Sequence, residues 1–450
     1  MTTADRALWR PFLVFLLPMM ATNILQSLSG TINNILLGRL IGTHALAAAA
    51  TFFPVMFLFI AFLVGLSAGA RVLIGQAWGA KEPLTVKSIT GSVLTVTFLG
   101  GLAIGIGASL AAAPIMRGLG TPADIFDDAV AFARVSFLSL PLLFVFLVSA
   151  SMLRGVGDTL TPLTIQVLAT VLSALTTAAL IQGWLGLPRL GILSAAVSGP
   201  ISFGVSVVAL GAYLRYRRHP MAPDRVLFER LRPDPRLLRL VLKIGLPTGL
   251  QVIVGAVSGL VIVGLVNSFG SDATAAYGAV SQVFSYAQFP ALSVGITTSI
   301  FGAQMIGAGR IHRLGDVLRT GLVLNLLLTG TLVAIIYLFS RPIVGLFVTD
   351  ADVAALAERL LHTVVWSSLL FGTATVFSGL MRASGVVLVP MIIGIACILG
   401  IELPVAYLMA GRIGLPGIWW GFVGNFAVLM CAQALYYHFV WKKKRIARMV

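Results

Sequence analysis

The sequence predicts an all-α membrane protein with twelve transmembrane helices in two six-helix lobes, and three observations support this. Of 450 residues, 58% are hydrophobic and only 10% are charged, whereas soluble globular chains carry about 25% charged residues. Twelve apolar runs are long enough to cross a bilayer, which takes about 20 residues. The two halves of the chain also repeat each other at one spacing, which predicts lobes related by a pseudo-two-fold axis along the membrane normal.

The apolar runs fall in two sets of six, separated by one polar segment. This segment, 215–238, is interpreted as a cytoplasmic linker between an N-terminal lobe (1–214) and a C-terminal lobe (239–450). Many runs contain Gly and Pro, which membrane helices tolerate because neighbouring helices satisfy the freed backbone groups. The runs lie near 10–38, 46–74, 88–114, 126–153, 160–183, 191–214, 239–268, 273–304, 317–339, 354–381, 388–410 and 417–441.

The basic residues predict the orientation of these spans. Of 31 Lys and Arg residues, 24 fall on the same side as the N-terminus and 5 on the opposite side. Basic loops stay in the cytoplasm, so both termini are expected to be cytoplasmic, as in a multi-pass protein of a bacterial inner membrane. The same distribution explains the net charge of +16, because the basic residues anchor the topology near anionic lipid. Nucleic acid is therefore not expected as a partner.

Five positions in three separate motifs recur at an offset of 228 residues. Because each half contains six spans, an even number, both halves enter the membrane from the same side. Parallel repeats of this kind enclose a central cavity and suit alternating access, in which the cavity opens to one side at a time. The pairs are Gly42 and Gly270, Gly79 and Gly307, Arg154 and Arg382, Gly157 and Gly385, and Pro162 and Pro390.

The sequence does not predict an enzyme. It contains no HExxH, no G-x-S-x-G and no nucleotide-binding P-loop. The Gly-rich stretch "GVGDT" lacks the P-loop lysine and is interpreted as a tight cytoplasmic turn. Cys397 and Cys431 lie in apolar runs, so neither a disulfide framework nor a metal site is expected. We expect no cofactor, and active transport would use an ion gradient.

Six motifs, in order along both halves, give the chain a family resemblance. The chain resembles the multidrug and toxic compound extrusion (MATE) family. The resemblance implies two six-helix lobes and cation-coupled export of amphipathic, often cationic, organic compounds. It also implies coupling by H+ or Na+ through carboxylates buried in a lobe. The motifs are "GRLIGTHALAA", "GQAWGA", "LRGVGDTLTP", "GLPTGLQ", "GAQMIGAG" and "LPVAYLMAGRIGLPGIWWG".

The N-terminal lobe departs from the family in one respect. Many members carry an aspartate in the first helix, and the matching residue here is Asn33. Positions in the fifth helix that hold Asn and Asp in the family match Ser173 and Thr177, and a hydroxyl position in the sixth helix matches Ser198. The resemblance therefore implies an N-lobe polar cavity without a carboxylate, which cannot exchange a proton near neutral pH.

Acidic residues of the C-terminal lobe are the other candidates for coupling. The family positions for a seventh-helix glutamate and a tenth-helix aspartate match Gly255 and Phe371, which carry no charge. Of the 15 acidic residues, only Glu402 lies well inside a span. A carboxylate in low dielectric holds a proton or cation until water or substrate reaches it.

Two interpretations of Glu402 remain open. In the functional interpretation, it is the coupling group or the counter-charge for a cationic substrate. In the structural interpretation, its charge is satisfied by a neighbouring arginine or by a backbone group left free near Pro404. Further polar residues are candidates for the C-lobe substrate cavity or, alternatively, for interhelical hydrogen bonds. These are Gln251, Gln282, Tyr286 and Gln288.

The sequence thus predicts a monomeric multidrug antiporter that exchanges H+ for small organic substrates. H+ is favoured over Na+ because the N-terminal lobe offers no anionic ligand for a hard cation. One alternative is a flippase or exporter of a lipid-linked or endogenous amphipathic metabolite, which basic residues in the cavity would favour. A non-transporting membrane scaffold is a third possibility, against which the preserved repeat and Glu402 argue.

Overall fold

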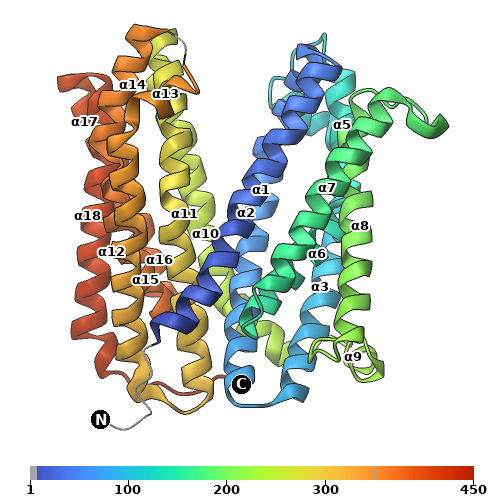
Figure 1. The fold of residues 1–450 in the computed structure, drawn as a ribbon, viewed down its shortest axis with the longest axis vertical. Coiled ribbons are helices and arrows are strands. Elements are labelled where there is room, and N and C mark those ends of the chain that lie inside the picture. The colour runs from blue at the N-terminus through green and yellow to red at the C-terminus, as the bar shows by residue number, and fades with distance from the viewer. Residues whose placement is uncertain (1–7, 349) are drawn as a thin grey trace. The chain divides into compact units, whose positions relative to one another are not determined.

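The computed structural model describes residues 8–348 and 350–450, and every regular element within them is a helix (Figure 1). Contacts between Cα atoms divide the chain into two compact units. The N-terminal unit is Ala21–Gly245, and the C-terminal unit combines Met1–Met20 with Leu246–Val450. The predicted all-α class is confirmed.

Within each unit the long helices run alongside one another (Figure 1). Helix α1 (Trp9–Leu40) contributes its second part to the N-terminal unit, and α10 (Pro235–Asn267) contributes its first residues. The other elements of this unit are α2 (Thr43–Gly79), α3 (Pro83–Leu110), α4 (Ala112–Gly118), α5 (Phe126–Leu138), α6 (Leu140–Gly155), α7 (Leu160–Gln182), η1 (Trp184–Gly186), α8 (Leu193–Tyr216) and α9 (Arg225–Glu229).

The C-terminal unit holds the start of α1, the rest of α10 and all elements that follow α10. A π-helical turn, η3, interrupts the eleventh span. The elements after α10 are α11 (Ser271–Gly307), η2 (Ile311–Arg313), α12 (Leu314–Leu338), α13 (Ser340–Gly345), α14 (Ala351–Val364), α15 (Ser367–Ala383), α16 (Leu388–Cys397), η3 (Ile398–Glu402), α17 (Leu403–Ile413), α18 (Leu415–Phe439) and η4 (Trp441–Lys443).

The described residues contain 11 helices long and apolar enough to span a membrane, or 12 when the bent pair α5 and α6 is counted as one. The twelve predicted spans are therefore confirmed. The sequence predicted an uninterrupted span over 126–153, but the chain bends by 49° between Leu138 and Leu140. Pro141, in the first turn of α6, explains the break because proline has no N–H and its ring clashes with the carbonyl four residues earlier.

The repeat is visible in the backbone of its turns. Gly157, after α6, has φ 97°, and Gly385, after α15, has φ 79°. Side chains rarely adopt this left-handed region, whereas glycine does so without a steric penalty. The same residue type is therefore required at both positions, 228 residues apart.

The boundary between the units falls within two continuous helices. It crosses α1 between Met20 and Ala21, shortly after Pro18, and α10 between Gly245 and Leu246, directly before Pro247. The lobe limits that the sequence analysis set at 214 and 239 stay a prediction.

Aromatic packing explains why the start of α1 belongs to the C-terminal unit. The rings of Phe12 and Phe15 lie 4.3 Å and 5.7 Å, centroid to centroid, from the ring of Phe301 on α11. Leu16 and Met19, both with 0% exposure, belong to the same buried cluster. Buried aromatic and aliphatic surface of this extent holds a helix to its neighbours.

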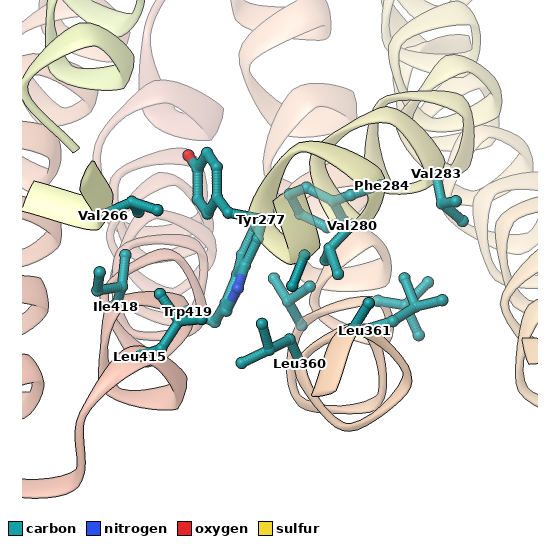
Figure 2. Packing of buried hydrophobic residues seen from close by; sticks show 14 of the residues in the cluster. Val266, Tyr277, Val280, Val283, Phe284, Leu360, Leu361, Leu415, Ile418 and Trp419 are labelled. Atoms are coloured by element: carbon teal, nitrogen blue, oxygen red, sulfur yellow. The ribbon is translucent and has the colours of Figure 1, made fainter. Parts of the chain in front are cut away.

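Trp419 lies at the centre of the largest described hydrophobic cluster of the C-terminal unit (Figure 2). Its ring stacks on Tyr277 with a centroid distance of 4.9 Å and meets Phe284 edge-on at 6.0 Å. The cluster joins α11, α14 and α18 through residues such as Leu360 and Ile418. It fixes the rotation of α18, which carries a residue of the candidate site.

The polar segment before α10 packs against α3. Asp224 caps α9 by accepting a hydrogen bond from Leu227 N at 2.9 Å, and it pairs with Lys87 of α3. The hydrogen bond from Lys87, together with that backbone bond, lowers the pKa of Asp224 below its ordinary value. Thr95 Oγ1 also donates to Leu231 O at 2.7 Å. The segment is thus anchored to the N-terminal unit.

Candidate functional site

Glu402 lies at a break in the eleventh span. It is the last residue of η3, between α16 and α17, and only 5% of its surface is exposed. Pro404 follows in the first turn of α17 and contributes no N–H. Single π-turns inside α-helices are frequent at functional sites. The local sequence therefore places a buried carboxylate where the helix is irregular.

Two neutral side chains hold the carboxylate. Ser258 Oγ, on α10, donates a hydrogen bond to Glu402 Oε1 at 2.7 Å, and Asn425 Nδ2, on α18, donates to Oε2. Ser258 and Asn425 are 2% and 3% exposed. Three helices of one unit thus converge on Glu402, and both carboxylate oxygens accept a hydrogen bond.

No basic side chain among residues 8–348 and 350–450 forms an ion pair with Glu402. Of the two partners expected for a structural glutamate, an arginine is therefore not found there. The other, a backbone group freed near Pro404, stays a prediction. Asn425 Oδ1 is also buried and accepts no hydrogen bond from the described residues. Buried polar atoms almost always have a partner, so this orphan acceptor next to a carboxylate requires an explanation.

Small residues bring α18 close to Glu402. A Cβ atom added at Gly421 would lie 2.6 Å from Glu402 O and 2.9 Å from Ala406 Cβ. Only a glycine allows the α18 backbone to approach η3 and α17 at this distance. Asn425, four residues later on the same helical face, is thereby brought within reach of the carboxylate.

The four residues of the predicted N-lobe cavity lie together as two hydrogen-bonded pairs. Asn33 Nδ2 donates to Ser173 Oγ at 3.2 Å, and Thr177 Oγ1 donates to Ser198 Oγ at 2.8 Å. Ser173 and Thr177 are one turn apart on α7 and join the pairs. Thr177 and Ser198 have 0% exposure, while Asn33 is half-buried. The cluster contains no charge.

The two polar clusters use corresponding helices of the repeat. The N-terminal cluster lies on α1, α7 and α8; the C-terminal cluster lies on α10, η3 and α18. The offset of 228 relates these helices, but it maps Glu402 onto Ala174, the neighbour of Ser173. Each unit therefore has a polar site formed by the first, fifth and sixth spans of its repeat. Of these two sites, the C-terminal one carries an acid and the N-terminal one does not.

The four further residues predicted for the C-lobe cavity do not hydrogen-bond to Glu402. The Gln251 amide lies against α16, where a Cβ at Gly394 would be 2.3 Å from Nε2. Gln282 is exposed, whereas Tyr286 and Gln288 are half-buried, and Tyr286 meets Phe289 edge-on at 5.6 Å. Their role in a cavity stays a prediction.

The uncharged positions Gly255 and Phe371 both lie beside apolar side chains. A Cβ at Gly255 would meet Ile398 Cδ1 at 4.0 Å, and Phe371 packs against Phe426 at a centroid distance of 5.0 Å. Sequence reasoning missed Ser258 and Asn425, the partners of Glu402. The one available signal was an amide inside the last span, in "GNF".

Comparison with known proteins assigns the family. The sequence model of the MatE family matches residues 18–178 and 247–408. The chain is 40% identical to "Probable multidrug resistance protein YoeA" of Bacillus subtilis over 99% of its own length and 96% of that protein. It is 26% identical to "Multidrug export protein MepA" of Staphylococcus aureus, over 93% and 91% of the two chains.

The fold agrees with solved structures of the same family. A variant of the Vibrio cholerae MATE transporter VcmN superposes with a TM-score of 0.88 at 22% sequence identity, covering 98% of both chains. The family match covers most of the chain, and the chain has the same fold as this MATE transporter. Both agree with the twelve spans and the six ordered motifs. The protein belongs to the multidrug and toxic compound extrusion (MATE) family.

Proposed function

We propose that this protein exports amphipathic or cationic organic compounds by alternating access, in exchange for H+, and that Glu402 is the coupling group. The names of its relatives, a probable multidrug resistance protein and a multidrug export protein, support the substrate class. The single observation that carries the coupling proposal is the surroundings of Glu402: a buried carboxylate between a hydroxyl and an amide, with no basic partner among the described residues.

The hydroxyl and the amide suit a group that gains and loses a proton. A serine hydroxyl donates or accepts, and an amide offers either its N–H groups or its oxygen. Ser258 and Asn425 both donate to the ionised carboxylate. When Glu402 is protonated, rotation of the Asn425 amide by 180° presents Oδ1 as an acceptor. An arginine partner would stabilise only the ionised form, so the pair supports exchange rather than a fixed charge.

This rotation also explains the orphan acceptor. In the ionised arrangement Asn425 Oδ1 accepts no hydrogen bond from the described residues, which costs about 1–3 kcal/mol. In the protonated arrangement the same oxygen accepts the new O–H. The unsatisfied oxygen in one state is thus the partner of the proton in the other.

Na+ is the alternative coupling ion at the same site. The two carboxylate oxygens, Ser258 Oγ and Asn425 Oδ1 offer four oxygen ligands, which is fewer than hard cations such as Ca²⁺ take. Flux measurements in proteoliposomes with an imposed pH or Na+ gradient separate the two ions. We expect substrate efflux to follow the pH gradient and to be unaffected by Na+. Efflux driven by Na+ at constant pH would contradict the proposed ion.

The orientation and assembly are part of this proposal. A monomer is proposed in a bacterial inner membrane, with both termini and the Arg-rich segment 215–238 in the cytoplasm. The positive charge of this segment supports the assignment, because basic loops are retained on the cytoplasmic side.

Asn33→Asp tests whether the N-terminal cluster also lies on a transport path. Asn33 is half-buried and bonded to Ser173, so an aspartate there introduces a titratable group into an otherwise neutral cluster. In a Glu402→Gln background we expect this change to make efflux pH-dependent again, by up to about tenfold per pH unit, since one group is titrated.

Asn34→Asp is the matched control for that experiment. Asn34 lies next to Asn33 but points about 100° away on α1, and no hydrogen bond from it to the cluster is seen among the described residues. We expect no restored pH dependence. Equal effects of both substitutions would show that the cluster around Ser173 is not a specific site.

A further inference from the structure

A cavity of about 600 Å³ opens in the N-terminal unit at the end of α8. The turn between α6 and α7, the first turn of α7 and the residues after α8 surround it. The lining residues that matter for its chemistry are Asp158, Thr161, Tyr213, Arg217, Arg218 and His219. The cavity is built from a segment other than the Glu402 site, so its role is independent of the coupling proposed above.

The cavity carries a net positive charge. Its acid, Asp158, caps α7: Oδ1 accepts from Thr161 N at 3.0 Å and Oδ2 accepts from Thr161 Oγ1 at 2.6 Å. Neither Arg217 nor Arg218 takes part in an ion pair within the described part of the chain. Both arginines are exposed, and Arg217 Cζ lies 5.9 Å from the ring centroid of Tyr213. The lining thus holds two guanidinium groups and one carboxylate, whose oxygens already accept hydrogen bonds.

His219 adds a hydrogen-bond donor. Its Nδ1 accepts a hydrogen bond from Met221 N at 3.2 Å, so the proton of the neutral ring lies on Nε2. Burial lowers the pKa of His219 below its ordinary value, although the charge of Asp158 opposes this. Two arginines and one aspartate give the rest of the lining a net charge of +1.

Arg218 has a backbone conformation that non-glycine residues rarely adopt, and Lys81, after α2, is the other described example. Arg218 has φ 50°, in a turn closed by a hydrogen bond from His219 N to Leu214 O at 2.9 Å. The left-handed conformation is unfavourable for a non-glycine residue, and glycine is the usual residue at this position after a helix. At the end of α7 the chain does use one, Gly183, with φ 75°.

Two aromatic residues place the cavity at the level of lipid headgroups. Tyr213 and Tyr216, in the last turn of α8, are 41% and 86% exposed. Tyrosines at the ends of spans lie at the membrane–water interface. Leu160, an exposed apolar residue, also lines the cavity. Basic cavities at this depth on the cytoplasmic side bind anionic lipid headgroups.

We propose that this cavity binds a singly charged phosphate diester, the headgroup phosphate of an anionic phospholipid. The guanidinium groups of Arg217 and Arg218 bind the phosphate oxygens, as such groups do with good geometric fit, and His219 Nε2 donates a further hydrogen bond. The net charge of +1 matches a diester monoanion. The exposed aromatic and apolar rim contacts the glycerol and the upper acyl chains.

Binding of phosphatidylglycerol to the purified full-length protein in neutral detergent tests this. We expect saturable binding that phosphatidylcholine does not displace. Arg217→Gln with Arg218→Gln should weaken it roughly 25-fold, from about 1 kcal/mol per basic residue near a membrane surface. The matched control is Arg225→Gln with Arg236→Gln, which removes the same charge from exposed residues outside the cavity. Equal losses in both double variants would overturn the site.

Arg218→Gly separates binding from folding. It removes one guanidinium and also relieves the left-handed backbone, so we expect headgroup binding to weaken about fivefold while the thermal midpoint stays the same or rises. Unchanged binding would overturn the proposal. Displacement of the lipid by glycerol phosphate at comparable concentration would assign the cavity to a free phosphate ester and overturn the lipid as its ligand.

Discussion

Glu402→Gln is expected to abolish accumulation of substrate driven by a pH gradient. One pH unit is worth about 1.4 kcal/mol per proton, so an electroneutral one-for-one exchange sustains about a tenfold substrate gradient. Glutamine keeps the size of the side chain. Its oxygen can accept from one of the two partners and its NH2 group can donate to the other once that partner turns its acceptor round, but it cannot release a proton. The steady-state substrate ratio across proteoliposomes should therefore fall from about ten to about one.

Two further variants make this result specific. Glu229→Gln is the matched control, because Glu229 is an exposed glutamate paired with Arg225 on the short helix α9; it should leave the tenfold ratio intact. Glu402→Asp retains the acid and should keep part of the gradient. A Glu402→Gln protein that still accumulates substrate tenfold, with an unchanged thermal midpoint, would show that coupling lies elsewhere.

Gly379→Val is expected to destabilise the C-terminal unit by about 3 kcal/mol and Gly379→Ala by about 1–2 kcal/mol. A Cβ at Gly379 would lie 2.3 Å from Gly295 O, where α15 crosses α11. Backbone atoms on the far side cannot rotate away, so the helices must separate. The thermal midpoint of the purified protein in detergent, with the monodisperse fraction after heating, measures this.

Gly264→Ala is the control for the crossing. No described atom lies within 4 Å of a Cβ at Gly264 on α10, so the change adds helix propensity without a clash and the midpoint should not fall. If Gly379→Ala and Gly264→Ala unfold at the same temperature, the crossing of α11 and α15 is wider than described.

The corresponding helices of the N-terminal unit, α2 and α6, make a different contact where they cross. The positions that the repeat relates to Gly295 and Gly379 are Ser67 and Ser151. Ser151 Oγ donates to Ser67 O at 3.2 Å and accepts from Arg71 at 3.2 Å. A serine hydroxyl thus makes the contact that glycine backbone makes in the C-terminal unit. The repeat keeps the crossing of the two helices but not the groups that form it.

Much of the fold could be predicted because its signals are local. Each span is a run of about 20 apolar residues, and the repeat positions Gly157 and Gly385 mark turns that need a left-handed backbone. Glu402 could be found by elimination, since an acid inside a span is rare. The bend before Pro141 was missed because apolar sequence continues across it.

The environment of Glu402 could not be predicted because it depends on how distant helices are rotated. Ser258 lies 144 residues before Glu402 and Asn425 lies 23 residues after it. The sequence around a neutral polar residue in a span does not indicate which residue it will hydrogen-bond to. The π-turn that ends at Glu402 has no clear sequence signal either. The N-lobe cluster was located through the family resemblance, not through the residues alone.

The packing of the start of α1 has a consequence for the time course of biosynthesis. Phe12 and Phe15 contact Phe301, which is made some 290 residues after them. At about 5–20 residues per second, the ribosome needs on the order of 15–60 s to supply that partner. Throughout this interval the ring surfaces of Phe12 and Phe15 must be covered by lipid or by the insertion machinery. Helix α1 is made long before it gains its full set of neighbours.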